Sequence, residues 1–128
     1  MAKKYQIFLL ILLSYLTIFA FYPALSAGFI DLDDPVMVVE NPYITSLSLN
    51  NIKAVFSQSY YKLYHPLVTL SYAVEYYFFK LDPYFYHLDN ILIHLFNTLI
   101  VFFIFKKLSK SFLVSYIVAL LFAIHPVH

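Results

Sequence analysis

The chain contains no cysteine, which excludes both a disulfide framework and a thiolate metal site. Charged residues are also scarce, at 12% of the 128 residues, whereas 62% of the residues are hydrophobic and 21% are aromatic. A soluble globular domain carries about twice that share of charged residues. The composition therefore indicates a membrane protein.

The apolar residues are grouped in three runs rather than scattered along the chain. The runs cover residues 5–22, 88–105 and 112–128. Each approaches the roughly 20 residues that a helix needs to cross a hydrocarbon core of about 30 Å, and the third is the shortest. We therefore expect an all-α membrane protein with about three transmembrane helices, connected by the long segment 23–87 and the short turn 106–111.

Positive and negative charges lie on different parts of the chain. All seven acidic residues lie between Asp31 and Asp89, whereas five lysines flank the apolar runs: Lys3, Lys4, Lys106, Lys107 and Lys110. Because lysines in short loops mark the cytoplasmic side, we expect the N-terminus and the turn 106–111 to be cytoplasmic. The acidic segment 23–87 then lies outside the cytoplasm, and the protein is a multi-pass integral membrane protein.

The first apolar run also has the features of a cleavable signal peptide. Two lysines precede it, and a small-x-small triplet follows at residues 24–26. Its apolar part is longer than the roughly 7–15 residues of a signal sequence, and two further runs follow, so the pattern favours a retained anchor. N-terminal sequencing of the mature protein distinguishes the two.

Segment 23–87 has structure of its own according to its sequence pattern. Apolar residues recur at helical spacing over residues 49–56, after a turn expected at the Asn-Pro pair of residues 41–42. A second helix is expected to begin at Pro66 and to stop at the Asp-Pro pair of residues 82–83. Because the part-apolar rings of the many tyrosines favour the headgroup level, we expect these helices to lie in the membrane interface.

The second apolar run carries a narrow stripe of polar side chains. On a helix that advances about 100° per residue, one face holds His87, Asn90, His94 and Asn97. Polar groups at membrane depth are costly unless they face protein or water, so we expect the stripe to face the bundle interior. The two histidines lie over ~10 Å apart along the axis, which argues against chelation of one metal by both. Interhelical hydrogen bonds and a substrate lining both remain open.

Asp33 and Asp34 are the strongest candidates for chemistry. Adjacent carboxylates hold a proton more tightly than one alone, so one of them can act as a general base or bind a hard cation. An acidic loop in water is usually only solvated, so spacing alone leaves both interpretations open. Asp31 and Asp33 also match the Asp-x-Asp metal motif of nucleotide-sugar transferases, but those enzymes use soluble folds that this chain cannot build.

Five short motifs follow one another between Gly28 and His128: the Asp-Asp pair, Glu-Asn-Pro, His-Pro-Leu, His-x-x-Asn-x-x-x-His and His-Pro-x-His. Their order resembles the N-terminal part of the transmembrane and tetratricopeptide-repeat proteins, which are related to GT-C protein O-mannosyltransferases. The chain differs from the family pattern at Leu32, where an aromatic residue is usual, and at Lys80, where a glycine is usual.

The resemblance implies a partial GT-C fold and a glycosyltransferase that moves a sugar such as mannose from a polyprenyl-phosphate carrier to an extracytoplasmic acceptor such as a protein Ser or Thr. It implies a lipid-linked sugar donor, an acceptor protein and the membrane as partners, and no nucleic acid. No cofactor is identified, although a divalent cation is compatible with the carboxylates. The general base is expected at Asp33 or Asp34, with Asp33 preferred. Substrate binding is expected at His65, His87, Asn90, His94 and His125.

Related proteins continue through further spans and then through helical repeats. This chain has no arginine and few lysines in segment 23–87 that could hold the phosphate of a lipid donor. We therefore expect it to be the N-terminal portion of such an enzyme, inactive alone. The alternative is a truncated, non-catalytic membrane scaffold or assembly protein. In-frame coding sequence for further apolar spans favours the enzyme, and an immediate stop codon favours the scaffold.

Overall fold

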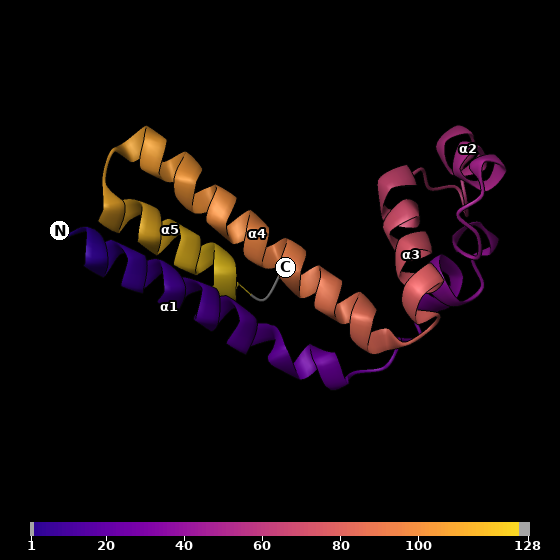
Figure 1. Cartoon of the computed structure of the whole chain (residues 1–128), viewed down its shortest axis with the longest axis horizontal. Coiled ribbons are helices and arrows are strands. Elements are labelled where there is room, and N and C mark those ends of the chain that lie inside the picture. The colour runs from indigo at the N-terminus through magenta and orange to yellow at the C-terminus, as the bar shows by residue number, and fades with distance from the viewer. Residues whose placement is uncertain (1, 126–128) are drawn as a thin grey trace. The chain divides into compact units, whose positions relative to one another are not determined.

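The computed structural model describes residues 2–125, and no β-strand occurs among them (Figure 1). This confirms the expected all-α class. The end of the expected third span and the Pro-x-His part of the last motif lie outside the described residues. The helices are α1 (Lys3–Phe21), α2 (Leu49–Ser57), α3 (Pro66–Phe79), α4 (Pro83–Ser109) and α5 (Phe112–Ile124). Three short elements complete the chain: the 3₁₀ turns η1 (Tyr22–Ser26) and η3 (Pro42–Ile44), and the π-helical turn η2 (Pro35–Val39).

The chain forms two compact units. The bundle unit contains the residues up to Leu25 and those from His87 onward, and the intervening unit covers Ser26–Tyr86. Most of the segment that was expected to connect the first two spans, residues 23–87, thus folds into a compact unit of its own. Each unit has its own buried core.

Two helices of the bundle unit are long and apolar enough to cross a membrane. One is α1 continued by η1, which together cover 24 residues, and the other is α4 with 27 residues. Helix α5 is apolar but has only 13 residues. At about 1.5 Å per residue it extends over roughly 20 Å, less than the ~30 Å of a hydrocarbon core. The structure thus supports two of the three expected spans, and they indicate a membrane protein.

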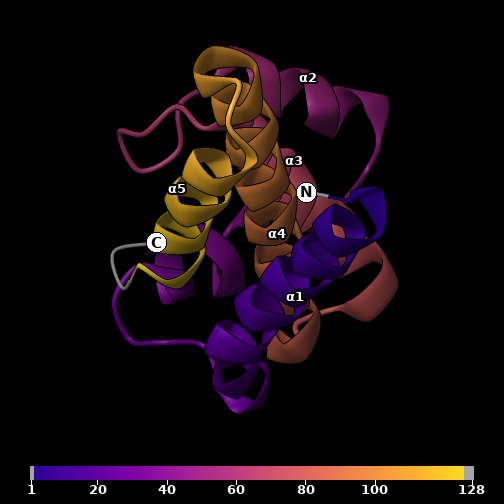
Figure 2. The same cartoon turned by 90° about the vertical axis from the view of Figure 1, so that its left-hand side faces the viewer.

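Helices α1, α4 and α5 lie side by side, with α4 antiparallel to the other two (Figures 1 and 2). Their shared core contains Leu13 of α1 and Phe102 of α4. Helix α5 contributes Ser115, Ala119 and Ala123, which are completely buried and spaced four residues apart. Small side chains at this spacing let two helix backbones approach closely. They explain why α5 packs against α1 in the bundle.

Polar side chains within the bundle helices bond to the preceding helical turn. The hydroxyls of Thr17, Thr98 and Ser115 donate to carbonyl oxygens four residues earlier, at 2.8, 2.9 and 2.6 Å. All three side chains are completely buried. Each hydroxyl therefore enters the apolar core with its hydrogen bond already made.

The turn between α4 and α5 is tighter than the expected segment 106–111. Helix α4 continues through its last lysines to Ser109, and Lys110 then adopts a left-handed conformation with φ of 55°. Ser111 caps α5 by accepting a hydrogen bond from the backbone N–H of Val114. A two-residue connection brings the helices back antiparallel and keeps the lysines together at one end of the bundle.

The intervening unit is built around two short turns and two helices. Its core contains Val38 of η2, Ile44 of η3, Ala73 of α3 and Tyr86 at the start of α4. The sequence predicted α2 and the start of α3 at Pro66 correctly, but α3 ends before the stop expected at the Asp-Pro pair of residues 82–83. Helix α3 ends at Phe79, because Lys80 has a positive φ of 57°.

Asn41 holds the two short turns together. Its side chain is 2% exposed; the amide nitrogen donates to the carbonyl oxygen of Met37, and the amide oxygen accepts from the N–H of Tyr43, both at 2.9 Å. These bonds cap η3 and fix its position against η2. They give the Asn-Pro pair of the sequence a structural role as well as the expected turn.

The first testable consequence concerns the orientation of the spans. Cysteines placed singly at the exposed residues Ser46 and Ser59 should react with a membrane-impermeant thiol reagent added outside sealed cells, and a cysteine at the exposed Ser109 should not. The absence of native cysteine gives the assay no background. Labelling of Ser109→Cys from outside contradicts the lysine argument.

A second prediction concerns Asn41. Replacing Asn41 with Ala removes the partner of two part-buried backbone groups, the carbonyl of Met37 and the N–H of Tyr43, and should destabilise the intervening unit by about 1–3 kcal/mol. Ala73 is buried, so a cysteine placed there by Ala73→Cys reacts with a thiol reagent only when the unit opens. Adding Asn41→Ala to this variant should raise the labelling rate roughly 5- to 150-fold. Asn50→Ala, at an exposed position of α2, is the matched control. Equal labelling rates in the two variants contradict the role of Asn41.

Candidate functional site

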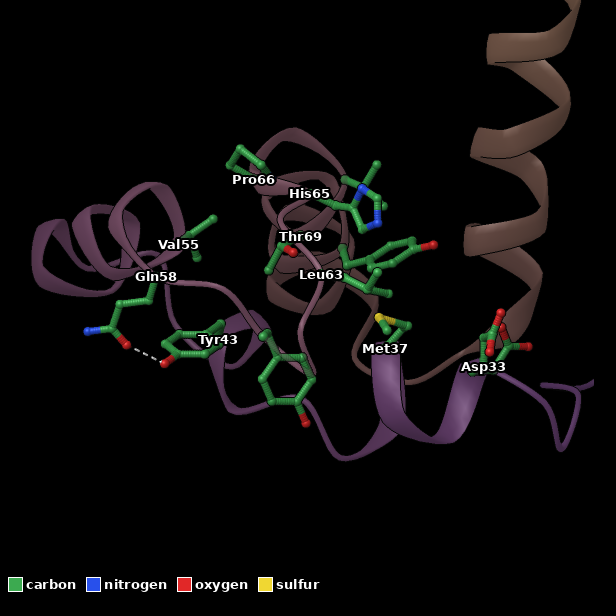
Figure 3. A pocket seen from close by; sticks show the side chains of 13 residues that line it. Asp33, Met37, Tyr43, Val55, Gln58, Leu63, His65, Pro66 and Thr69 are labelled. Carbon is green, nitrogen blue, oxygen red and sulfur yellow. Dashed lines mark hydrogen bonds between the residues drawn. The ribbon is translucent and has the colours of Figure 1, made fainter.

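The intervening unit contains a cavity of about 430 Å³, which lies between η2, η3, the end of α2 and the start of α3 (Figure 3). All of its lining residues belong to this unit. They are Asp33, Asp34, Met37, Tyr43, Val55, Gln58, Tyr60, Leu63, His65, Pro66, Val68, Thr69 and Tyr72. Three of the residues predicted from the sequence to be functional, at positions 33, 34 and 65, thus line the same cavity.

The two aspartates have different environments although they are adjacent. The carboxylate of Asp34 is half-buried and accepts a hydrogen bond of 2.8 Å from the N–H of Ile30, which closes a turn before η2. The side chain of Asp33 is exposed, and within residues 2–125 no hydrogen bond engages its carboxylate. Asp34 therefore stabilises the local backbone, whereas Asp33 presents a carboxylate that an incoming group can reach. Figure 3 shows Asp33 at one end of the cavity, next to Met37.

His65 enters the cavity from the start of α3. It is the N-cap residue of that helix, and Pro66 occupies the first helical position, as the His-Pro-Leu motif requires. The carbonyl oxygen of His65 accepts a bond of 2.9 Å from the N–H of Thr69, another lining residue. The His-Pro pair thus fixes where the helix begins, and this places His65 in the lining of the cavity.

The opposite end of the cavity is lined by phenol and amide groups. The hydroxyl of Tyr43 donates to Gln58 at 2.6 Å, and the rings of Tyr43 and Tyr60 meet edge to face at 5.7 Å (Figure 3). A tight turn follows, in which Tyr61 and Lys62 both have positive φ, at 48° and 64°. Non-glycine residues in this conformation cost roughly 1–3 kcal/mol each. The turn holds two lining residues, at positions 60 and 63, in place.

Negative charge and burial affect the phenol of Tyr72. Burial raises the pKa of Tyr72 above its usual value of 10.0, and the charges of Glu75 and Asp34 raise it further. Glu75 is itself buried, at 8% exposure. The described lining contains two carboxylates and no lysine. The cavity therefore suits a neutral, hydroxyl-rich or cationic group better than a phosphate.

Among residues 2–125, no three His, Cys, Asp or Glu side chains are grouped so that they can hold a metal ion. The carboxylates of Asp33 and Asp34 lie in the cavity with one imidazole, but these groups do not form a ligand set. The divalent cation considered from the sequence therefore has no preformed site in the described residues. Proton transfer and hydrogen bonding are the chemistry that the lining itself offers.

The other predicted site residues lie in the bundle unit. The Nε2 atom of His94 is 3.1 Å from the carbonyl oxygen of Ala123, and the imidazole packs against Phe21 at 4.9 Å and Phe122 at 5.3 Å. His94 of α4 thus contacts both α1 and α5, which supports the interpretation of this member of the stripe as an interhelical contact. His87 is half-buried, and His125 caps the end of α5 with an exposed side chain.

The expectation that the whole polar stripe faces the bundle interior is wrong for Asn90 and Asn97. Both asparagines are exposed. The buried face of α4 is formed by Ile91, Thr98 and Phe102 and lies further round the helix. His94 stands at the edge of that face, and the asparagines lie beyond it.

Sequence reasoning missed most of the polar lining. Tyr43, Gln58, Tyr60 and Tyr72 have no spacing that marks a site, and tyrosines of this kind also suit the membrane headgroup region. Comparison of the chain with protein-family models, with curated proteins and with solved structures gives no match.

The raised pKa of Tyr72 predicts a pH dependence. Because folding favours the neutral phenol, its contribution to stability is fully present below pH 10, the usual pKa, and is lost as the pH rises through the folded-state pKa. The thermal midpoint in detergent should therefore fall less between pH 9 and pH 11 in Tyr72→Phe than in the unchanged protein. Circular dichroism measures it, with the exposed Tyr61→Phe as control. Parallel curves for all three proteins contradict the prediction.

Proposed function

We propose that the chain is the N-terminal portion of a membrane glycosyltransferase and that the cavity of the intervening unit receives the acceptor. One observation carries the proposal: the Asp-Asp and His-Pro-Leu motifs, about thirty residues apart, line the same cavity. Two of the five motifs on which the resemblance rests thus bring carboxylates and an imidazole to one cavity. The proposed donor is a sugar on a polyprenyl phosphate, and the proposed acceptor is a protein hydroxyl.

The proposed step is a displacement at the anomeric carbon of the sugar. The acceptor oxygen forms a bond to that carbon, the bond from the carbon to the donor phosphate breaks, and the phosphate leaves with the electron pair. The acceptor proton passes to the carboxylate of Asp33, which acts as general base. The exposed carboxylate of Asp33 suits this role, whereas Asp34 is engaged by the N–H of Ile30 and positions the turn.

The remaining lining suits recognition of the acceptor. Tyr43, Gln58, Tyr60 and Thr69 offer hydroxyl and amide groups, which can bond to a peptide or to sugar hydroxyls. The described lining holds no lysine, so the donor phosphate is bound elsewhere. This agrees with a chain that needs further polypeptide to complete the donor site.

A non-catalytic membrane scaffold is the second candidate. The observation that favours it is the lack of lysine and arginine among the described lining residues of the cavity, because a scaffold needs no phosphate site. The two candidates differ in one measurable property, which is transfer of sugar by a completed chain.

The experiment uses the chain fused to the downstream spans of a full-length relative, so that an activity exists. Asp33→Asn keeps the shape and hydrogen bonding of the side chain but removes the base, and sugar transfer should fall by the 10²–10⁴-fold typical of losing general-base catalysis. Asp31→Asn is the matched control, because Asp31 is exposed in the same turn but does not line the cavity. Transfer should remain near the unchanged level in that variant.

Binding of the lipid-linked donor is measured in the same membranes. If Asp33→Asn and Asp34→Asn both transfer sugar at the unchanged rate while the donor still binds, the catalytic role of the pair is wrong. If the unchanged fusion binds no donor and transfers no sugar, the scaffold is the better account.

A further inference from the structure

One exposed face of α4 carries asparagines and isoleucines at heptad spacing. Its residues are separated alternately by three and four positions: Asn90, Ile93, Asn97, Ile100 and Ile104. All five side chains are exposed, and the three isoleucines retain 47%, 38% and 50% of their accessible surface. This spacing is that of the a and d positions of a helix that packs lengthwise along a partner helix. We call these five residues the asparagine face.

Lipid is a poor environment for this face. Asn97 lies eight residues before Phe105, where the apolar run ends, which places it roughly 12 Å along the helix and near the middle of a ~30 Å core. An amide that finds no hydrogen-bond partner in hydrocarbon is costly. A protein partner that both donates and accepts a hydrogen bond removes this cost.

The other exposed side chains along the apolar part of α4 need no hydrogen-bond partner. Leu92, Phe96 and Phe103 are also exposed, at 50%, 64% and 60%, but they are apolar, and their directions lie roughly 80–120° from the middle of the asparagine face. Lipid chains can cover them without loss. The need for a partner is thus confined to one side of the helix.

We propose that a second copy of this chain packs on the asparagine face and forms a parallel dimer through α4. A carboxamide carries both a donor and an acceptor, so Asn90 and Asn97 can each pair with the same residue of the second copy. All copies insert in one orientation, so their α4 helices run parallel and equal positions meet. The isoleucines between the asparagines supply the packing surface. This inference does not depend on the proposed function.

Disulfide cross-linking in native membranes tests the geometry, since the chain has no cysteine of its own. Single cysteines at Ile93 and Ile100 should form a dimer under mild oxidation, with a mass twice the 15.0 kDa of the chain. Cysteines at Phe96 and Phe103 are the matched controls and should leave the chain monomeric. Equal cross-linking at all four positions, or a product of another mass, overturns the proposal.

Energy transfer between labelled copies in bilayers tests the role of the amides. Asn97→Leu should weaken association about 5- to 30-fold, the effect expected of a hydrogen bond between membrane helices, whereas Asn97→Gln should retain it in large part. Circular dichroism of both variants checks that α4 is still helical. Association of Asn97→Leu that equals that of the unchanged chain overturns the proposal.

Discussion

Polar atoms within the apolar helices of this chain need partners inside the protein, and this constraint shapes the bundle unit. Three hydroxyls find a partner within their own helix, because each donates a hydrogen bond to a carbonyl oxygen of the preceding turn: those of Thr17, Thr98 and Ser115. His94 meets it across helices, at the carbonyl oxygen of Ala123. The small residues of α5 then allow close packing, because no hydroxyl in the contact is left without an acceptor.

In the intervening unit, polar backbone groups of the short turns find their hydrogen-bond partners in side chains. Asn41 satisfies backbone groups of η2 and η3, and Asp34 satisfies the N–H of Ile30. These bonds fix the ends of the cavity, while His65 is placed by the first turn of α3. The exposed carboxylate of Asp33 is thus carried on a backbone that its neighbours hold in place.

Much of the fold was predictable because local signals decide it. The proline at position 66, the Asn-Pro pair at 41–42 and the periodic apolar residues of α2 act within a few residues, and the structure has the helices and turns that they predict. The compact intervening unit was less predictable, because its core joins η2, η3, α3 and the start of α4. Contacts between elements so far apart in the sequence have no local signature.

The site was predictable only in part for the same reason. Asp33 and His65 stand out by residue type and motif, whereas the phenols of the cavity do not. Polarity alone predicts that the stripe lies on the buried face of α4, but packing of Ile91 and Phe102 determines which side of the helix is covered. Asn90 and Asn97 are therefore left on the exposed side of the helix.

The proposed function requires that the cavity of the intervening unit receives an acceptor hydroxyl. Photo-cross-linking of a Ser/Thr-containing peptide with a diazirine next to its hydroxyl tests it directly on the completed, membrane-embedded chain. The account predicts that mass spectrometry locates the adducts on lining residues such as Met37 and Tyr43, and that excess unlabelled peptide prevents them. Adducts confined to the bundle unit, or adducts that excess peptide does not reduce, contradict the account.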